Sequence, residues 1–134
     1  MTTNKTSAYR ESGILTADPI TLTTMLFDGT LRAVKKARIL HQDGNRDRYL
    51  DELQRASLIL GELLASLDLE QGEIPKTLSG IYTYCIRLLT EAGLGDMKFL
   101  DEVEMHISRV ATSWKAATAQ LRATGGTPVS PLGS

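Results

Sequence analysis

Apolar residues recur at alternating steps of three and four along four separate segments of this chain, and no other feature limits its fold so strongly. That spacing places side chains on one face of an α-helix, and such a face must pack against other helices. The clearest segment holds the row Leu50, Leu53, Ser57, Leu60, Leu64 and Leu67. A flanking row is formed by Tyr49, Ala56, Ile59 and Leu63. Together the two rows make a face wider than one neighbouring helix can cover.

A helix that precedes this segment is predicted to begin at Pro19. Asp18 can cap it with its carboxylate, and the fixed φ of proline suits the first helical position. The helix is expected to end at residues 43–45, where Gly44 can adopt the left-handed conformation and Asn45 can cap the second helix. Its predicted packing face consists of Leu22, Met25, Leu26, Gly29, Ala33, Ala37 and Leu40.

Two further helices are predicted after a turn over residues 68–74. Pro75 lies near the start of the third helix, and Gly93 and Gly95 are expected to stop it. Its packing face holds Leu78, Ile81, Tyr82, Cys85, Leu88, Leu89 and Ala92. Asp96 can cap the fourth helix. The face of that helix is formed by Leu100, Val103, Ile107, Val110, Trp114, Ala117 and Leu121.

Four amphipathic helices joined by short turns predict an all-α fold, an antiparallel up-and-down four-helix bundle over residues 18–122. Composition agrees, because aromatic residues make up only 5% of the chain, as suits helix-on-helix packing of Leu and Ala. Residues 1–17 are polar and mixed, and we expect them to form a flexible N-terminal leader. Residues 123–134 are rich in Gly, Thr, Pro and Ser, and we expect a disordered tail.

The charge balance excludes several classes of partner. With 15 basic and 16 acidic residues, the chain has no strong field to hold nucleic acid or an anionic membrane. A basic run in the first helix, residues 32–38, is interpreted as a solvated helix end. No apolar run is long enough for a membrane helix, and the single cysteine, Cys85, fits a reducing cytoplasm. We therefore expect a cytoplasmic location, no nucleic acid and no membrane insertion.

Helical bundles often hold metals, but the Glu-x-x-His pairs of such sites are missing here. The residues three before His41 and His106 are Arg38 and Val103, so both histidines are interpreted as solvated or hydrogen-bonding side chains. Cys85 lies within the apolar row of the third helix, where a thiol acts as a small hydrophobe. No phosphate-binding loop, nucleophile elbow or dinucleotide motif is found. The sequence therefore predicts no metal, no cofactor and no enzyme activity.

Several short stretches resemble a known family. Residues 9–19, Tyr-Arg-Glu-Ser-Gly-Ile-Leu-Thr-Ala-Asp-Pro, resemble the opening of the flagellin export chaperone family, FliS. Residues 25–32, Met-Leu-Phe-Asp-Gly-Thr-Leu-Arg, resemble its Met-Leu-Tyr-Asp-Gly-Ala-Ile-Arg signature, and Ser-Leu-Asp at 66–68 resembles its turn before the third helix. Trp114 falls where the family ends its fourth helix with Trp. The resemblance covers about residues 8–117, and Phe27 stands where the family has Tyr.

This resemblance implies a function. Members bind the C-terminal region of newly made flagellin in the cytoplasm, prevent its premature polymerisation, and deliver it to a membrane protein of the type III export gate. An amphipathic flagellin segment is expected to lie in a groove between helices. The free protein is expected to be a monomer or a weak homodimer. The residues predicted to contact flagellin or the export gate are Tyr9, Ile14, Leu15, Leu26, Phe27, Gly29, Leu58, Tyr82, Tyr84 and Leu88.

Some of these assignments leave two interpretations open. Leu58 lies opposite the main row of its helix, where an isolated exposed leucine is also an ordinary surface residue. Tyr84 lies off the seam of the third helix and fits core-edge packing as well as partner contact. Ile14 and Leu15 lead to the hypothesis that the leader masks a groove until flagellin displaces it. The alternative function is a helical module that bridges proteins or self-associates without flagellin.

Overall fold

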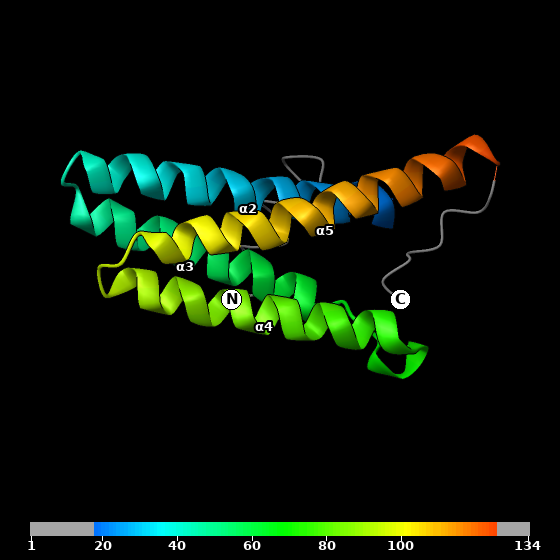
Figure 1. Ribbon diagram of the computed structural model, residues 1–134. Coiled ribbons are helices and arrows are strands. Elements are labelled where there is room, and N and C mark those ends of the chain that lie inside the picture. Colours follow the sequence, from blue (N-terminus) through cyan, green and yellow to red (C-terminus); the bar gives the residue numbers. More distant parts are fainter. Residues whose placement is uncertain (1–17, 126–134) are drawn as a thin grey trace, which may run out of the picture.

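The computed structural model describes residues 18–125, and its long helices run side by side (Figure 1). They are α2 (Pro19–Gln42), α3 (Arg46–Ala65), α4 (Glu73–Gly93) and α5 (Lys98–Ala123). One short 3-10 helix, η2 (Leu69–Gln71), lies between α3 and α4. Within residues 18–125 there are no strands. The all-α prediction is confirmed.

Each helix packs against the next one in the chain, and α5 packs back against α2 to close the bundle. Successive helices run in opposite directions because the connections between them are only a few residues long. The predicted antiparallel up-and-down topology is therefore confirmed. The predicted leader over residues 1–17 and most of the predicted tail, residues 126–134, lie outside the described residues.

Local chemistry sets the first helix boundaries as predicted. The Oδ1 atom of Asp18 accepts a hydrogen bond from the backbone N–H of Thr21 at 2.7 Å, which caps α2. At the other end of α2, Gly44 has a φ of 74°, the left-handed conformation that glycine adopts without a steric penalty. The side chain of Asn45 accepts from the N–H of Arg48 at 3.3 Å and caps α3.

Two later boundaries differ from the prediction. Helix α4 begins at Glu73, inside the predicted turn, so that Pro75 is its third residue. Proline is tolerated there because the first N–H groups of a helix have no partner within it. Helix α5 begins at Lys98 after Met97, although the carboxylate of Asp96 still accepts from the N–H of Lys98 at 3.1 Å.

The core lies along the axis of the bundle and takes residues from all four helices. In α2 the buried residues are Ile20, Thr23, Phe27, Thr30, Ala33, Val34 and Ala37. The prediction that Met25 packs inward is wrong, since its side chain is 39% exposed. Ala117 of α5 is also exposed, and Thr118 is buried in its place. Buried threonines are tolerated because their hydroxyls bond within the helix, as Thr30 Oγ1 donates to the carbonyl of Leu26 at 2.9 Å.

No helix within residues 18–125 is both long and apolar enough to cross a membrane.

Candidate functional site

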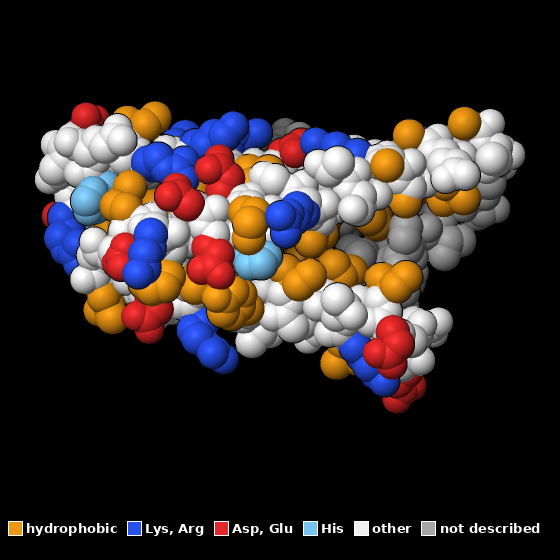
Figure 2. Space-filling view, viewed as in Figure 1, with side chains coloured by type: hydrophobic (Ala, Val, Ile, Leu, Met, Phe, Trp, Pro, Cys, Tyr) orange, Lys and Arg blue, Asp and Glu red, His pale blue; other side chains and the backbone are white. Residues whose placement is uncertain are grey.

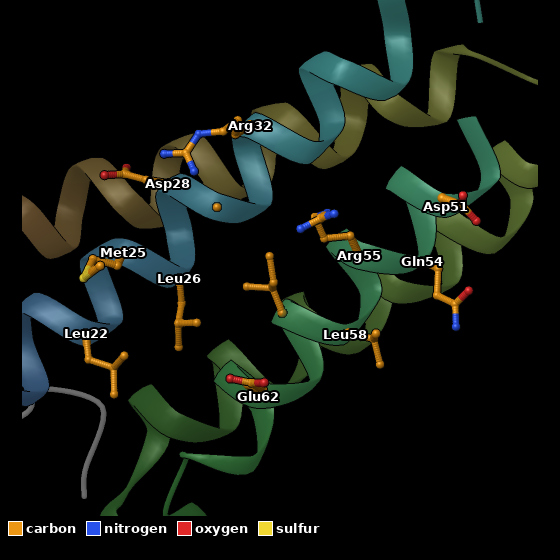
Figure 3. Close-up of a pocket in the computed structure, with 12 residues that line it drawn as sticks. Leu22, Met25, Leu26, Asp28, Arg32, Asp51, Gln54, Arg55, Leu58 and Glu62 are labelled. Atoms are coloured by element: carbon orange, nitrogen blue, oxygen red, sulfur yellow. The ribbon is translucent and has the colours of Figure 1, made fainter. Parts of the chain in front are cut away.

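A groove with a volume of about 760 Å³ lies between α2 and α3 (Figure 3). We call it the α2–α3 groove. Figure 3 shows Leu22 and Leu26 extending from α2 toward α3, and Arg55 extending from α3 toward α2. Its lining residues are Leu22, Met25, Leu26, Asp28, Gly29, Arg32, Asp51, Gln54, Arg55, Leu58, Ile59 and Glu62.

The groove exists because α2 carries two apolar stripes. Phe27, Thr30 and Val34 form part of the stripe that faces the core. Leu26 precedes Phe27 by one residue, and one residue rotates a side chain by about 100° around a helix. The stripe of Leu22, Met25, Leu26 and Gly29 therefore faces outward and stays partly exposed. The groove floor is apolar surface for which the core has no room.

Gly29 lets the two helices approach closely at the floor of the groove. A Cβ atom added there would lie 3.3 Å from Cδ1 of Ile59 on α3, which is tighter than most such contacts. Any larger residue at this position would push Ile59 aside or fill the groove. The position thus combines close helix packing with open space above it.

Charges of both signs line the rim of the groove. Asp28 and Arg32 come from α2, while Asp51, Arg55 and Glu62 come from α3. Asp28 accepts a hydrogen bond from Lys115 Nζ of α5 at 3.1 Å, and Arg55 lies 3.4 Å from Glu52. A mixed rim around an apolar floor suits an amphipathic protein segment, whose polar edges can pair with either sign.

A second, smaller groove of about 360 Å³ lies between the start of α4 and the C-terminal half of α5. We call it the α4–α5 groove. Figure 2 shows hydrophobic side chains gathered along the boundary between these two helices. The lining is apolar apart from Arg109 and Ser113. Its apolar lining residues are Ile74, Leu78, Val110, Trp114 and Ala117.

Three of the residues predicted from sequence as partner contacts meet in the α2–α3 groove. They are Leu26, Gly29 and Leu58, and Leu58 is 63% exposed. The structure does not bring the others there. Tyr9, Ile14 and Leu15 lie outside the described residues.

Phe27, Tyr82 and Leu88 belong to the core. Phe27 and Tyr82 have no exposed surface, and Leu88 is 4% exposed. The ring of Phe27 lies between two other aromatic rings, with centroids 6.4 Å from Tyr82 and 6.2 Å from Trp114. In this conformation these side chains offer a partner no surface.

Tyr84 lies on the surface of α4 and is bound to α5. Its hydroxyl donates a hydrogen bond to Glu102 Oε1 at 2.7 Å, and its ring stands edge-on to His106 with centroids 5.7 Å apart. The hydrogen bond to Glu102 raises the pKa of Tyr84 above its ordinary value, because it favours the protonated phenol. Of the two interpretations left open, packing at the core edge describes these contacts better.

Sequence reasoning missed several groove residues. Leu22 and Met25 were assigned to the packing face of the first helix, and Ile59 to that of the second. The available signal was the width of each apolar face, which exceeds what the core can accept. The rim charges gave no signal, because charged residues cover most helix surfaces.

The buried polar groups suggest no chemistry. Within residues 18–125, no three His, Cys, Asp or Glu side chains are placed to hold a metal ion. Burial raises the pKa of the Cys85 thiol to about 12, so it stays protonated and unreactive near neutral pH. The pKa of Tyr82 is raised by burial as well.

Comparison with known proteins decides the family. The sequence model of the flagellar protein FliS matches residues 2–121. The chain belongs to the FliS family. The flagellar secretion chaperone FliS of Salmonella typhimurium is 39% identical over 108 residues, which cover 78% of this chain and 80% of that protein. The flagellar secretion chaperone FliS of Escherichia coli is 36% identical, and the match covers 78% of this chain and 79% of that protein. The protein of the same name in Bacillus subtilis is 30% identical, and the match covers 85% of this chain and 86% of that protein.

Membership of the FliS family gives the chain a chaperone role in flagellar export. FliS proteins are chaperones and not enzymes, which agrees with the prediction made from the sequence. A chaperone of this kind has a flagellar export substrate as its partner. The grooves between helices are the surfaces at which to look for it.

Proposed function

We propose that this FliS chaperone binds the C-terminal region of flagellin in the cytoplasm, prevents its premature polymerisation, and delivers it to the flagellar type III export gate. The observation that carries the proposal is the α2–α3 groove, an open apolar floor with charges of both signs on its rim. Leu26, Gly29 and Leu58, three of the residues predicted as partner contacts, line it.

The dimensions of the groove suit a helical segment. Its lining on α2 runs from Leu22 to Arg32, a length of about 15 Å, or nearly three helical turns. An amphipathic helix can place apolar residues at every third or fourth position along such a floor. Covering the apolar stripe of a flagellin helix would keep it from contacting other flagellin molecules, as prevention of polymerisation requires.

Energetics set how much of the groove must be used. Full burial of one leucine contributes about 1.5–3 kcal/mol, whereas ordering a flexible segment costs about 2–5 kcal/mol. One or two contacts therefore give no useful affinity. The segment must bury most of the floor, including Leu58, to bind tightly.

Isothermal titration calorimetry with a peptide of the flagellin C-terminal region tests the proposal. Wild-type protein should bind one-to-one with a large negative heat-capacity change, the mark of apolar burial. Leu58→Asp should weaken binding about tenfold or more, because a charge replaces an apolar contact. Ile39→Asp is the matched control, since Ile39 is 57% exposed on α2 and does not line the groove.

Thermal melts of both variants must accompany the titration. Both should melt near the wild-type temperature, because each side chain is largely exposed. Equal weakening by Leu58→Asp and Ile39→Asp would exclude the groove. No heat with the folded wild-type protein would contradict flagellin binding and favour the bridging module.

Delivery to the export gate needs a separate assay. The cytoplasmic domain of an export-gate membrane protein should retain the chaperone–flagellin complex on a column, and Tyr9→Ala should reduce the retention if that residue serves the gate. Size-exclusion chromatography of the free chain tests the predicted monomer or weak homodimer. A stable dimer that persists on dilution would contradict it.

A further inference from the structure

The α4–α5 groove is not needed for the function proposed above. It lies at the end of the bundle where α5 finishes, and Figure 1 shows α4 and α5 diverging toward that end. Ile74 on its edge is 64% exposed, while Trp114 forms its floor with 4% exposed. The Trp114 indole N–H already donates to Thr24 Oγ1 at 2.9 Å, so an occupant can reach only the small exposed edge of the ring that lines the groove.

Residues 126–134, which lie outside the described residues, have a sequence that fits this groove. They read Gly-Thr-Pro-Val-Ser-Pro-Leu-Gly-Ser and contain no charged side chain. Two prolines three residues apart favour the polyproline II conformation, which has three residues per turn. In that conformation Val129 and Leu132 share one edge, the two prolines share a second, and Thr127 and Ser130 share the third. Two edges are apolar and one is polar.

We propose that residues 126–134 fold back across the end of α5 and lie in the α4–α5 groove as a polyproline II segment. Val129 and Leu132 would contact the apolar lining, and the edge of Thr127 and Ser130 would face water. The groove is then an intramolecular docking site for the tail.

The length of the tail matches the position of the groove. Gly125, the last described residue, has a φ of 70°, which turns the chain away from the axis of α5. Going back along α5, Ala117 lies about 12 Å and Val110 about 22 Å from Gly125 at the usual rise. Along a polyproline II tail, Val129 lies about 12 Å and Leu132 about 22 Å from Gly125. The two apolar tail residues therefore come level with Ala117 and Val110.

The chemistry of the groove also suits this occupant. Grooves with an aromatic wall are the common receptors for polyproline II segments, and Trp114 supplies the aromatic ring. A polyproline II backbone makes no internal hydrogen bonds, so its carbonyls need donors. The guanidinium of Arg109 and the hydroxyl of Ser113 are donors in the lining. The side chains of residues 126–134 carry no charge, so none of them brings a carboxylate or ammonium group into an apolar groove.

Tethering makes even a weak contact effective. A short flexible connection gives the tail an effective concentration in the millimolar range, so a contact with a Kd of about 1 mM is formed about half of the time. The tail would cover the groove reversibly and could be displaced by a tighter ligand.

Paramagnetic relaxation on the full-length chain tests the proposal. A nitroxide is attached to Gly133→Cys, on the polar edge of the tail, while buried Cys85 stays unlabelled in the folded protein. The label should broaden the methyl signals of Ile74, Leu78 and Val110. Adding Val129→Asp and Leu132→Asp should reduce this broadening about fivefold, because a tenfold weaker contact is seldom formed. Thr127→Asp with Ser130→Asp is the control with the same added charge, and it should leave the broadening unchanged.

Other outcomes would overturn the proposal. An equal loss of broadening in both double variants would show that added charge, and not loss of the apolar edge, releases the tail from the groove. Broadening that disappears on dilution would show a second copy as the occupant. If Ile14→Asp with Leu15→Asp shifted the groove signals while the tail variants did not, the leader would occupy the groove. No broadening in any variant would show that the groove is open to a partner.

Discussion

The two ends of the bundle are built from different residues. At the end where α2 finishes and α3 begins, small side chains from Ala33, Ala37 and Ala92 lie in the core, and Tyr49 donates a hydrogen bond to the carbonyl of Ala92 at 2.6 Å. Toward the opposite end, the core holds the ring of Phe27 between those of Tyr82 and Trp114, whereas the first end has, within residues 18–125, a single ring pair, Tyr49 and His41, with centroids 5.0 Å apart. We call these the narrow end and the wide end.

The cavities follow the same division. Two grooves lie in the half of the bundle that includes the wide end. They are the α2–α3 groove, of about 760 Å³, and the α4–α5 groove, of about 360 Å³. The cavity beside Leu50 and Gly93 at the narrow end has only about 200 Å³. Side chains at a helix contact set how closely the helices approach. The comparison teaches that a core filled by large aromatic rings has no room for a second apolar stripe, which then stays outside as the floor of a groove.

Truncating the aromatic cluster should give the largest effect and remove the difference between the ends. Phe27→Ala leaves a large cavity between Tyr82 and Trp114 and should cost about 3–5 kcal/mol of unfolding free energy. Leu26→Ala, one residue away on the outer stripe, should cost about 1 kcal/mol because the side chain is only partly buried. Urea unfolding followed by far-UV circular dichroism measures both. Similar losses would contradict the assignment of the two stripes.

A pair of tyrosine substitutions sharpens the comparison with a smaller effect. Tyr49→Phe removes one of the hydrogen bonds that the carbonyl of Ala92 accepts, while the N–H of Gly95 still donates to it at 3.1 Å, and should cost about 0.5–1.5 kcal/mol. The Tyr82 hydroxyl is buried and has no hydrogen-bond partner in the described part of the chain. Tyr82→Phe should therefore leave stability unchanged or raise it slightly, because it removes a buried polar group. The same urea titration measures both variants, and a loss on Tyr82→Phe as large as on Tyr49→Phe would show a hidden partner.

Mildly alkaline pH, just above the unfolded pKa of Cys85, should give the smallest effect. Burial raises the folded pKa of Cys85 from 9.0 to about 12, so the unfolded chain loses this proton first. The contribution to stability is complete below pH 9, the unfolded pKa, and is lost as the pH rises toward the folded value of about 12. Wild-type protein should therefore begin to lose stability between about pH 9 and about pH 9.5, and Cys85→Ala should lose less over the same interval. If the unfolding free energy of the wild type and of Cys85→Ala fell with pH at the same slope, the thiol would be accessible to water in the folded state.

Helix boundaries could be predicted where a short stretch of sequence decides them. Asp18 and Asn45 cap through their own side chains, and Gly44 needs only its own backbone freedom, so nothing distant is required. The start of α4 was predicted too late because Pro75 was taken to mark it. Proline is allowed at each position of the first turn and does not choose among them.

The candidate site could be predicted only in part. Leu26, Gly29 and Leu58 were identified, whereas Leu22, Met25 and Ile59 were assigned to packing faces. Thr23 and Thr30 concealed the true core stripe of α2, because a pattern of apolar letters does not count a buried threonine. The hydroxyl of Thr30 is bonded within its own helix.

The sequence by itself determined the number of helices, their approximate limits and their antiparallel order, because caps, glycines and apolar spacing act over a few residues. Only the tertiary structure decided which apolar stripe of each helix turns inward. That choice depends on how Phe27, Tyr82 and Trp114 fit together across α2, α4 and α5. A close-packed core accepts one stripe from each helix, and on α2 the stripe left outside forms the floor of the α2–α3 groove.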